Sequence, residues 1–224
     1  MKAEAEGYNQ RLMLSGGGMN EKEAGSDYES MLNPDGSGVM GYLEIPKISV
    51  SLPILHGTGD EVLARGIGHL QGSSLPVGGK GTHAVLTGHR GLPSARLFTD
   101  LDQMEETDRF RILTLGEELD YEVSEIRTVL PENTRDLKIL PEEDLVTLVT
   151  CTPYGVNSHR LLVRGTRVPY NGEEEIESTA AESMLKSIQN YYMIYLILGL
   201  SVTLLVILLM KFLIKPGKKK HKKE

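Results

Sequence analysis

Short apolar runs separated by turn-forming residues recur through the middle of the chain. Seven or eight of them lie between residues 38 and 170, among them GYLEIPKI, THAVLTG, RFRILTL and DLVTLVTC. Runs of this length bounded by glycine, proline and polar residues are typical of an all-β barrel or sandwich. We expect strand edges or strand breaks at Pro46 and Pro53, because proline cannot donate to a β-ladder. The apolar spacing in LFTDLDQM, residues 97–104, predicts one connecting helix.

The segments on either side of this body have other patterns. Residues 1–37 are polar, with a short helix-like start followed by a run of three glycines, and indicate a loosely ordered N-terminal arm. Residues 171–190 are polar and begin with acidic residues, which favours a helical juxtamembrane stalk. We therefore divide the chain into an arm, a folded body at 38–170, the stalk, and the two segments described next.

Residues 191–214 begin with an uncharged stretch, YYMIYLILGLSVTLLVILLM, and predict a transmembrane helix. As a helix this stretch would be about 30 Å long, which matches the hydrocarbon thickness of a bilayer. The tail at 215–224 is rich in lysine, so the positive-inside rule predicts a cytoplasmic C-terminus and a body outside the cell membrane. The first residues contain no apolar signal segment, and we expect a secretion signal upstream of the sequence given. A tail-anchored protein with a cytosolic body is the alternative, but it would export the lysines.

The formal net charge of −7 conceals an asymmetry between body and tail. Seven lysines lie in residues 211–224, so the remainder of the chain is more acidic than the total suggests. An acidic body without a basic, aromatic-interleaved stripe argues against nucleic acid as a partner. Paired cysteines and HExxH are both absent from the sequence, and we predict no metal and no cofactor.

Cys151 is the single cysteine of the sequence. A lone thiol outside the cell cannot form an intramolecular disulfide, although it could serve as a small buried apolar residue. Its surroundings favour chemistry instead. The apolar run 145–149 delivers Cys151 to a strand end, Arg160 begins the next predicted strand, and His89 follows the predicted strand AVLT at a glycine-flanked turn.

These three residue types match the needs of a nucleophilic thiol. The thiol requires a group that takes its proton, and the developing oxyanion requires a cation or hydrogen-bond donor. His159 is a rival for either role, but strand alternation should direct it to the face opposite that of Arg160. Each of His56 and His69 could line a cleft, and we favour hydrogen bonding within their loops. We assign no role to His83.

Several segments resemble the signature motifs of sortases. They are TLVTC ending at Cys151, TGHRG around His89, and HRLLVRG containing Arg160. The segments GVMGYLEIPKI, LPILHGT, GHLQGSSLPVGG and TGHRGLPSARLFTDL are similar to the class C branch, which assembles pili. The similarity covers about residues 28–170. A C-terminal membrane span is also a trait of class C.

The resemblance implies an eight-stranded sortase-type β-barrel with short connecting helices on the outer face of a Gram-positive cell. It implies a transpeptidase that cleaves an LPXTG-like sorting signal between Thr and Gly. Cys151 would form a thioester, His89 would act as acid and base, and Arg160 would stabilise the oxyanion. The expected partners are pilin or surface proteins with such signals, and the expected acceptor is a pilin lysine amine.

Alternatives to pilus assembly remain at this stage. The acceptor could be peptidoglycan, or the chain could be a non-enzymatic, membrane-tethered β-domain that binds surface proteins. Class C sortases generally carry an N-terminal lid with an Asp-Pro-aromatic motif, and no Asp-Pro occurs before Tyr28. The arm could still form an atypical lid, for which Met19 would be the first candidate anchor.

Overall fold

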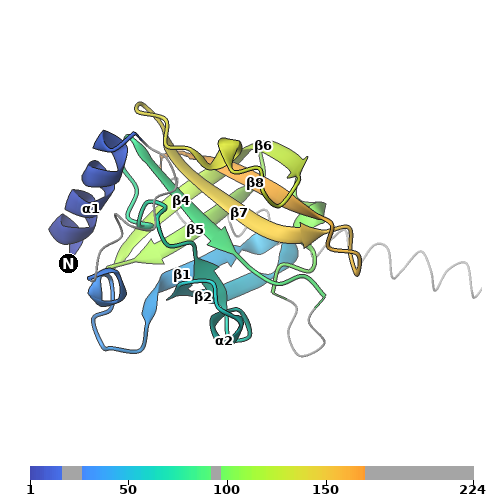
Figure 1. Ribbon diagram of the computed structural model, residues 1–224, viewed down its shortest axis with the longest axis horizontal. Helices are drawn as coiled ribbons and strands as arrows, with labels where there is room; N and C mark the ends of the chain where they lie inside the picture. Colours follow the sequence, from blue (N-terminus) through green and yellow to red (C-terminus); the bar gives the residue numbers. More distant parts are fainter. Residues whose placement is uncertain (17–26, 92–96, 170–224) are drawn as a thin grey trace, which may run out of the picture. The chain divides into compact units, whose positions relative to one another are not determined.

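The computed structural model describes residues 1–16, 27–91 and 97–169 (Figure 1). Eight strands close into a barrel in the order β1-β2-β3-β4-β7-β8-β6-β5, which confirms the expected eight-stranded barrel. The strands are β1 (Val39–Ile45), β2 (Val50–His56), β3 (Ile67–His69), β4 (Thr82–Thr87), β5 (Arg109–Thr114), β6 (Glu117–Val129), β7 (Asp144–Thr152) and β8 (His159–Arg167). The helices are α1 (Lys2–Leu14) and α2 (Asp60–Leu63), and the 3-10 turns are η1 (Tyr28–Ser30), η2 (Pro46–Ile48), η3 (Leu101–Gln103) and η4 (Arg135–Leu137).

Three neighbouring strands, β4, β7 and β8, form the part of the barrel that matters most for function. β4 runs parallel to β7, with pairs from Thr82↔Asp144 to Thr87↔Val149. β8 runs antiparallel to β7 and also pairs with β6. Because β4 and β7 are parallel, their C-terminal ends meet at the same end of the sheet.

Side chains on these three strands alternate between the barrel interior and its outer surface. Leu86, Leu148 and Val163 belong to the main core, whereas Val85 and Leu162 form a second apolar cluster with Leu137 of η4. Sheet faces that are covered on both sides have apolar residues at successive positions. This explains why the strands read as continuous apolar runs rather than as an alternation.

Pro46 and Pro53 were expected at strand edges or strand breaks. The closed barrel has no free edge strand, but both prolines lie where a missing N–H is tolerated. Pro46 starts η2 and breaks the chain between β1 and β2, as expected. Pro53 lies inside β2 and pairs with Tyr42 on one side. The pairing of β2 with β3 on its other side begins only at Ile54, so Pro53 has a single strand neighbour.

The connecting helix expected over residues 97–104 is reduced to the short turn η3. Phe98, Leu101 and Met104 are all buried and recur at every third position. A period of three matches the 3-10 geometry, in which residues i and i+3 eclipse, better than the 3.6-residue α-helix. The prediction of a helix was therefore wrong in type and too long.

The N-terminal arm is not loosely ordered where the structure describes it. α1 buries Ala5, Tyr8 and Leu12 in the main core, and Tyr28 of η1 is 3% exposed. The Asn9 side chain donates to the Leu75 carbonyl at 3.0 Å and accepts from the Leu75 N–H at 2.7 Å. Apolar packing and this buried pair of hydrogen bonds together overcome the polar composition of the segment.

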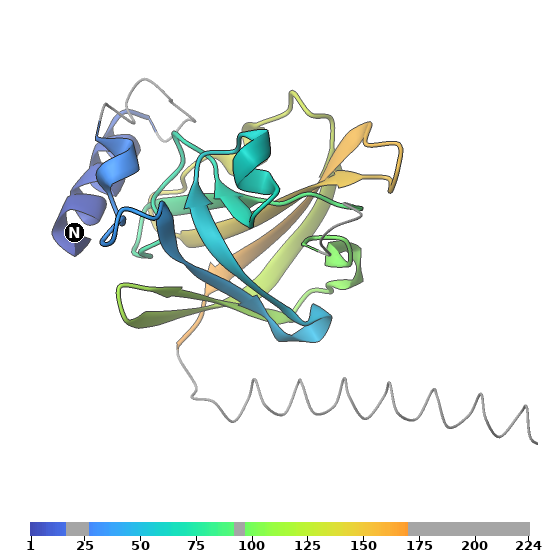
Figure 2. The ribbon, with the colours of Figure 1, turned by 90° about the horizontal axis from the view of Figure 1, so that it is seen from below.

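Figures 1 and 2 show α1 at one end of the barrel and the turn between β7 and β8 at the other. The expectations for residues 170–224, including the stalk and the span at 191–214, lie outside the described residues, as does Met19. Within the ranges that are described, we find no helix with the length and apolar character needed to cross a membrane.

Candidate active site

Cys151 and Arg160 occupy directly opposed positions on two antiparallel strands. The register of β7 and β8 pairs Cys151 with Arg160, and the preceding pair on the same face is Val149 with Leu162. Side chains at directly opposed positions of an antiparallel pair have Cβ atoms about 5 Å apart and point to the same face. The strand pairing thus brings the thiol and the guanidinium together on the outer face of the sheet.

His89 reaches the same place from the parallel strand β4. The register pairs Thr87 with Val149, and the Gly88 N–H continues the ladder by donating to the Val149 carbonyl at 3.1 Å. The hydroxyl of Thr150 donates to the Gly88 carbonyl at 2.8 Å. These bonds hold the exit of β4 beside the end of β7. His89 therefore lies next to Cys151 across the sheet.

Close packing beneath Gly88 fixes the path of the chain into His89. A Cβ added at Gly88 would lie 2.8 Å from the Phe98 ring and 2.9 Å from the Ile67 side chain. The Phe98 N–H also donates to the His89 carbonyl at 3.1 Å. Only glycine allows this approach, since any side chain would push β4 away from its neighbours.

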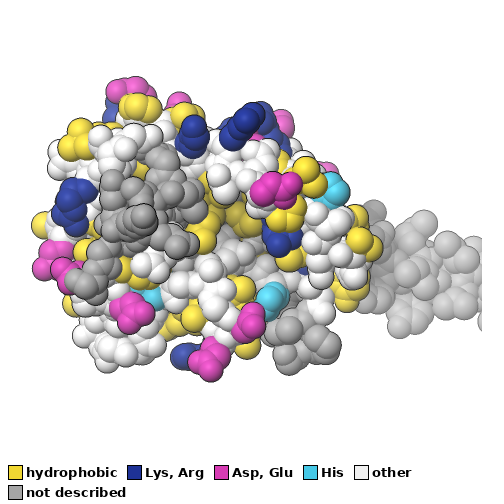
Figure 3. Space-filling model, viewed as in Figure 1, with side chains coloured by type: hydrophobic (Ala, Val, Ile, Leu, Met, Phe, Trp, Pro, Cys, Tyr) yellow, Lys and Arg dark blue, Asp and Glu magenta, His cyan; other side chains and the backbone are white. Residues whose placement is uncertain are grey.

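All three residues line a cleft of about 350 Å³ on the outer face of β4, β7 and β8. Figure 3 shows apolar side chains gathered in a hollow over these strands. Cys151, His89 and Arg160 are each half-buried, so they are both supported by the fold and accessible. The other lining residues are Thr58, Leu63, Leu70, Val85, Thr87, Gly88, Val129, Leu130, Pro131, Asn133, Thr134, Leu137, Val149 and Leu162.

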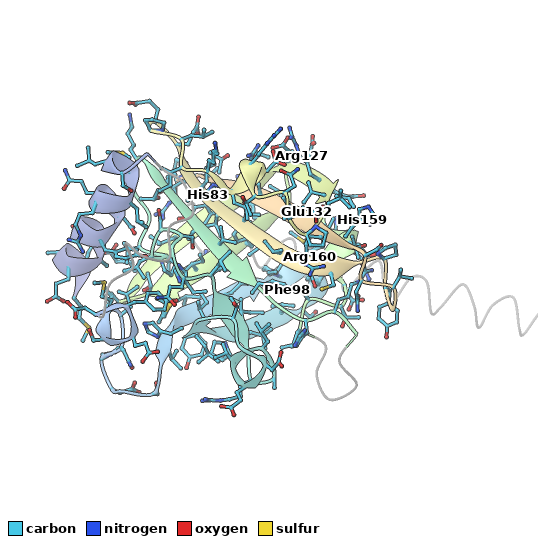
Figure 4. All side chains as sticks on the ribbon, in the orientation of Figure 1. His83, Phe98, Arg127, Glu132, His159 and Arg160 are labelled. Atoms are coloured by element: carbon cyan, nitrogen blue, oxygen red, sulfur yellow. The ribbon has the colours of Figure 1, made fainter. Side chains whose placement is uncertain are left out.

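Backbone carbonyls hold the guanidinium of Arg160 at the cleft. Its Nη1 donates to the carbonyl of Asn157 at 3.2 Å and to that of His159 at 3.0 Å. Both acceptors are carbonyl oxygens, and within the described residues no carboxylate forms a salt bridge with Arg160. Figure 4 shows Arg160 and His159 near the start of β8. A cation oriented in this way can stabilise negative charge that develops next to Cys151.

The remaining histidines do not line the cleft among the residues that the structure describes. His159 pairs with Thr152 on the alternate face of β8, and its Nδ1 contacts the Ser158 hydroxyl at 2.9 Å. The ring nitrogens of His56 face the carbonyls of Gly38 and Met31. The sequence favoured a structural role for His56 through hydrogen bonds in a loop. His56 instead ends β2, and its hydrogen bonds reach the segment before β1.

His69 and His83 are fully buried and hydrogen-bonded. Nδ1 of His69 contacts the Tyr28 hydroxyl at 2.8 Å, and Nε2 contacts the Ser74 carbonyl at 2.8 Å. The His83 ring lies between the Lys138 carbonyl and the Thr147 hydroxyl. Burial lowers the pKa of both imidazoles to about 4, because desolvation penalises the charged form. Both histidines therefore serve the fold as neutral groups.

Two residues beside the cleft had no assigned role in the sequence, namely Arg90 and Thr152. Arg90 lies inside the TGHRG motif, but its neighbour His89 supplied the obvious chemistry. The Nη1 of Arg90 donates to the Thr152 hydroxyl at 3.2 Å. This contact between the residue after the histidine and the residue after the cysteine is a side-chain hydrogen bond that only the folded structure shows.

A larger hollow of about 550 Å³ lies elsewhere, between β1 and the turn joining β5 to β6. Its described lining residues include Asp35, Glu117 and Glu118 but no cysteine, histidine or lysine. It therefore lacks the thiol and the imidazole that the smaller cleft combines. In the part of the chain that is described, no group of three or more His, Cys, Asp or Glu residues is placed to hold a metal ion.

Comparison with known proteins identifies the family. Residues 43–168 match the family model of the sortase domain. This chain belongs to the sortase family. Sortases are cysteine transpeptidases, and the solved structures that resemble this one include class C sortases, so the chain is a sortase-type cysteine transpeptidase of class C.

Two solved structures and one curated relative illustrate the similarity. Sortase C1 from Streptococcus agalactiae is 53% identical with a TM-score of 0.70, covering 75% of this sortase and 87% of that chain. A structure described as sortase C1 of GBS pilus island 1 is 45% identical with a TM-score of 0.70, covering 77% of this sortase and 83% of that chain. Sortase D of Bacillus subtilis is 31% identical over 143 residues, which span 62% of this sortase and 69% of its relative.

Proposed function

We propose that this sortase cleaves an LPXTG-like sorting signal between Thr and Gly and transfers the new carboxyl end to a lysine amine of a pilin. The observation that carries the proposal is that Cys151, His89 and Arg160 line the same, largely apolar cleft. The apolar floor suits the Leu and Pro of such a signal, since burial of apolar side chains favours binding. The scissile bond would then lie over the thiol.

The first half of the reaction forms a thioester. The thiolate of Cys151 attacks the threonine carbonyl carbon, and Arg160 stabilises the oxyanion that develops on the carbonyl oxygen. His89 donates a proton to the departing glycine amine as the C–N bond breaks. The peptide bond is thus replaced by a thioester, and the glycine-bearing fragment leaves.

The second half transfers the acyl group to the acceptor. His89 takes a proton from the incoming lysine amine, which attacks the thioester carbonyl. The C–S bond breaks, the thiolate of Cys151 is regenerated, and a new amide links the two proteins. No external energy source is required, because one amide bond is exchanged for another.

The assignment to pilus assembly is supported by the description of one of the similar structures. That protein, described as sortase C1 of a pilus island, is 45% identical to this chain. Attachment to peptidoglycan would use the same thioester and differ only in the amine. The proposal therefore separates into a donor reaction, which the cleft supports, and an acceptor preference, which a competition experiment tests.

The test uses the purified full chain and a fluorogenic peptide that contains Leu-Pro-x-Thr-Gly. We expect mass spectrometry to detect an acyl adduct on Cys151, and we expect Cys151→Ala to abolish the adduct. His89→Ala and Arg160→Ala should each slow its formation by about 10²-fold or more while the barrel remains folded. Covalent products formed by Cys151→Ala would refute the proposed mechanism.

A competition experiment tests the acceptor. A peptide carrying a pilin lysine and a peptidoglycan stem peptide carrying a free amine are offered together to the preformed thioester. We expect the pilin lysine to be acylated preferentially. Preferential acylation of the stem peptide would instead assign the enzyme to anchoring proteins on peptidoglycan.

We further propose that residues 191–214 anchor the enzyme in the cell membrane with the catalytic domain outside and the C-terminus in the cytoplasm. The support is the uncharged stretch and the lysine-rich tail that follows it. Protease added to intact cells should digest the body, while a tag placed after Glu224 should be protected. External cleavage of that tag would show the opposite orientation.

A further inference from the structure

Arg90, the residue after His89, is held by bonds from all three guanidinium nitrogens. Nε donates to the Thr99 carbonyl at 3.2 Å, and Nη1 donates to the Thr152 hydroxyl at 3.2 Å. Nη2 forms an ion pair with Asp102 at 2.5 Å. The Arg90 side chain is only 9% exposed. A planar guanidinium bound in three directions is fixed in both position and orientation.

The loop that contains Arg90 also packs directly on the turn between β7 and β8. The guanidinium carbon lies 5.9 Å from the ring centroid of Tyr154, within the range of a cation–π contact. Gly91, with φ of +77°, approaches the same ring so closely that an added Cβ would lie 2.7 Å from it. Arg90 and Gly91 together therefore hold the exit of β4 against this turn.

The contacts of Arg90 join the segments that carry the reactive groups. Arg90 follows His89 in the chain, and Thr152 follows Cys151. Thr152 is next to Cys151 on β7, so strand alternation turns it away from the cleft. Arg90 lies beyond the end of β4, and neither residue lines the cleft. The bond between them is thus a crosslink behind the reactive pair, and Arg90 does not touch a substrate bound in the cleft.

We propose that Arg90 is a positioning residue, which sets the placement of His89 relative to Cys151 through its bond to the Thr152 hydroxyl. The inference rests on the proposed function, in which His89 exchanges protons at the reacting centre. A displacement of about 1 Å between reacting groups can cost up to about 10²-fold in rate. A direct bond between the residues that follow the base and the nucleophile limits such displacement.

A purely structural role would have different consequences. If Arg90 only stabilised the barrel, its variants would unfold more easily, but the folded fraction would react at the normal rate. If it positions His89, the variants would bind peptide normally and react slowly. The two roles are separated by measuring kcat and KM well below the unfolding midpoint, together with the midpoint itself.

Thr152 offers the sharpest variants, because Thr152→Val removes the hydroxyl with little change of shape and Thr152→Ser retains it. For thioester formation by the full chain, we expect Thr152→Val and Arg90→Lys each to lower kcat about tenfold, with KM within about twofold of wild type. Thr152→Ser, which keeps the hydroxyl, should keep kcat close to that of the wild type. Arg90→Lys keeps the charge but cannot supply three fixed donors.

A double variant and a distant control complete the design. If Arg90 acts through Thr152, then Arg90→Lys combined with Thr152→Val should be little slower than either single variant. Arg109→Lys is the matched control, since Arg109 forms a partly exposed ion pair with Glu122 on β5 and β6, away from the cleft. The inference would be overturned if Thr152→Val had the kcat of the wild type. It would also be overturned if the kcat of Thr152→Ser were as low as that of Thr152→Val.

A second readout does not depend on the sorting peptide. The rate at which iodoacetamide alkylates Cys151 is measured against pH in the wild type, Arg90→Lys and Thr152→Val. Because a neighbouring imidazole affects the thiolate, both variants should shift the profile in the same direction. An unchanged profile in both would also refute the positioning role. If the wild type forms no thioester, the proposed function fails, and the alkylation profile still decides the role of Arg90.

Discussion

Cys151 and Arg160 are cross-strand partners, and their side chains share the outer face of the β7–β8 pair. The relationship is set by backbone register rather than by a side-chain contact between the two residues. A shift of one residue would move one of them to the other face of the sheet. The register is held from both sides, because β8 is hydrogen-bonded to β7 and to β6.

This register leads to a prediction for Arg160→Lys. The carbonyls of Asn157 and His159 hold the guanidinium in place, and a lysine ammonium cannot reproduce its planar donors. Loss of one oxyanion donor costs about 10²- to 10³-fold in kcat. We expect a decrease of that order in the rate of thioester formation, measured by stopped-flow fluorescence. His159→Gln, at the next position but on the alternate face, should change the rate by less than about threefold and serves as the control.

Gly88→Ala should destabilise the enzyme and displace His89. The new methyl group would meet Phe98 and Ile67 at less than 3.0 Å, and such overpacking costs about 1–3 kcal/mol. We expect a lower urea midpoint and a lower kcat. Adding Phe98→Leu should recover part of both losses by making room. A Gly88→Ala enzyme with unchanged stability would show that the strand exit is not tightly packed.

Asn9→Ala should weaken the attachment of α1 to the barrel and so lower the free energy of unfolding. The change leaves the N–H and the carbonyl of Leu75 without their buried partners, which costs about 1–3 kcal/mol. We expect this loss in the free energy of unfolding, measured by chemical denaturation. Gln10→Ala, at an exposed position of the same helix, should change it by less than about 0.5 kcal/mol. An equal effect of the two variants would contradict the docked helix.

Acid should destabilise the barrel partly through His83. Its pKa is about 4 in the folded protein and about 6.5 in the unfolded chain, so the unfolded state binds more protons between these values. Stability is therefore lost as the pH falls from about 6.5 toward 4. A fall to pH 5 costs about 2 kcal/mol for this one group.

His83→Gln removes the titrating group while keeping side-chain hydrogen-bonding atoms. Unfolding free energies at pH 7 and pH 5 should differ less in this variant than in the wild type, by about 2 kcal/mol. The comparison with wild type cancels the carboxylates that titrate in the same range. Identical pH dependence in the two proteins would mean that His83 is not held neutral by burial.

The sequence predicted the strands of the site better than the parts that surround them. The run 145–149 predicted β7, and the loop after it placed Cys151 and Arg160 on neighbouring strands. This worked because strand ends are marked by local turn residues. By contrast, the bond from Arg90 to Thr152 joins residues far apart in the sequence, and no local pattern reports it.

The helix α1 shows why the polar N-terminus was misread. Ala5, Tyr8 and Leu12 form a stripe at helical spacing, but the stripe is narrow and the other positions are polar. Asn9 extends the buried face by bonding to Leu75, a backbone site that only the folded barrel provides. Burial of a polar residue through a distant backbone partner has no signature in the sequence itself.

The position of β8 in the barrel also has a consequence for the timing of activity. β8 is the last strand that the structure describes, and its insertion between β6 and β7 both completes the barrel and supplies Arg160. A chain still being synthesised can therefore present the thiol of Cys151 without the cation beside it. The strand that closes the barrel is also the strand that sets Arg160 opposite Cys151, so we expect the pair to form only when the barrel closes.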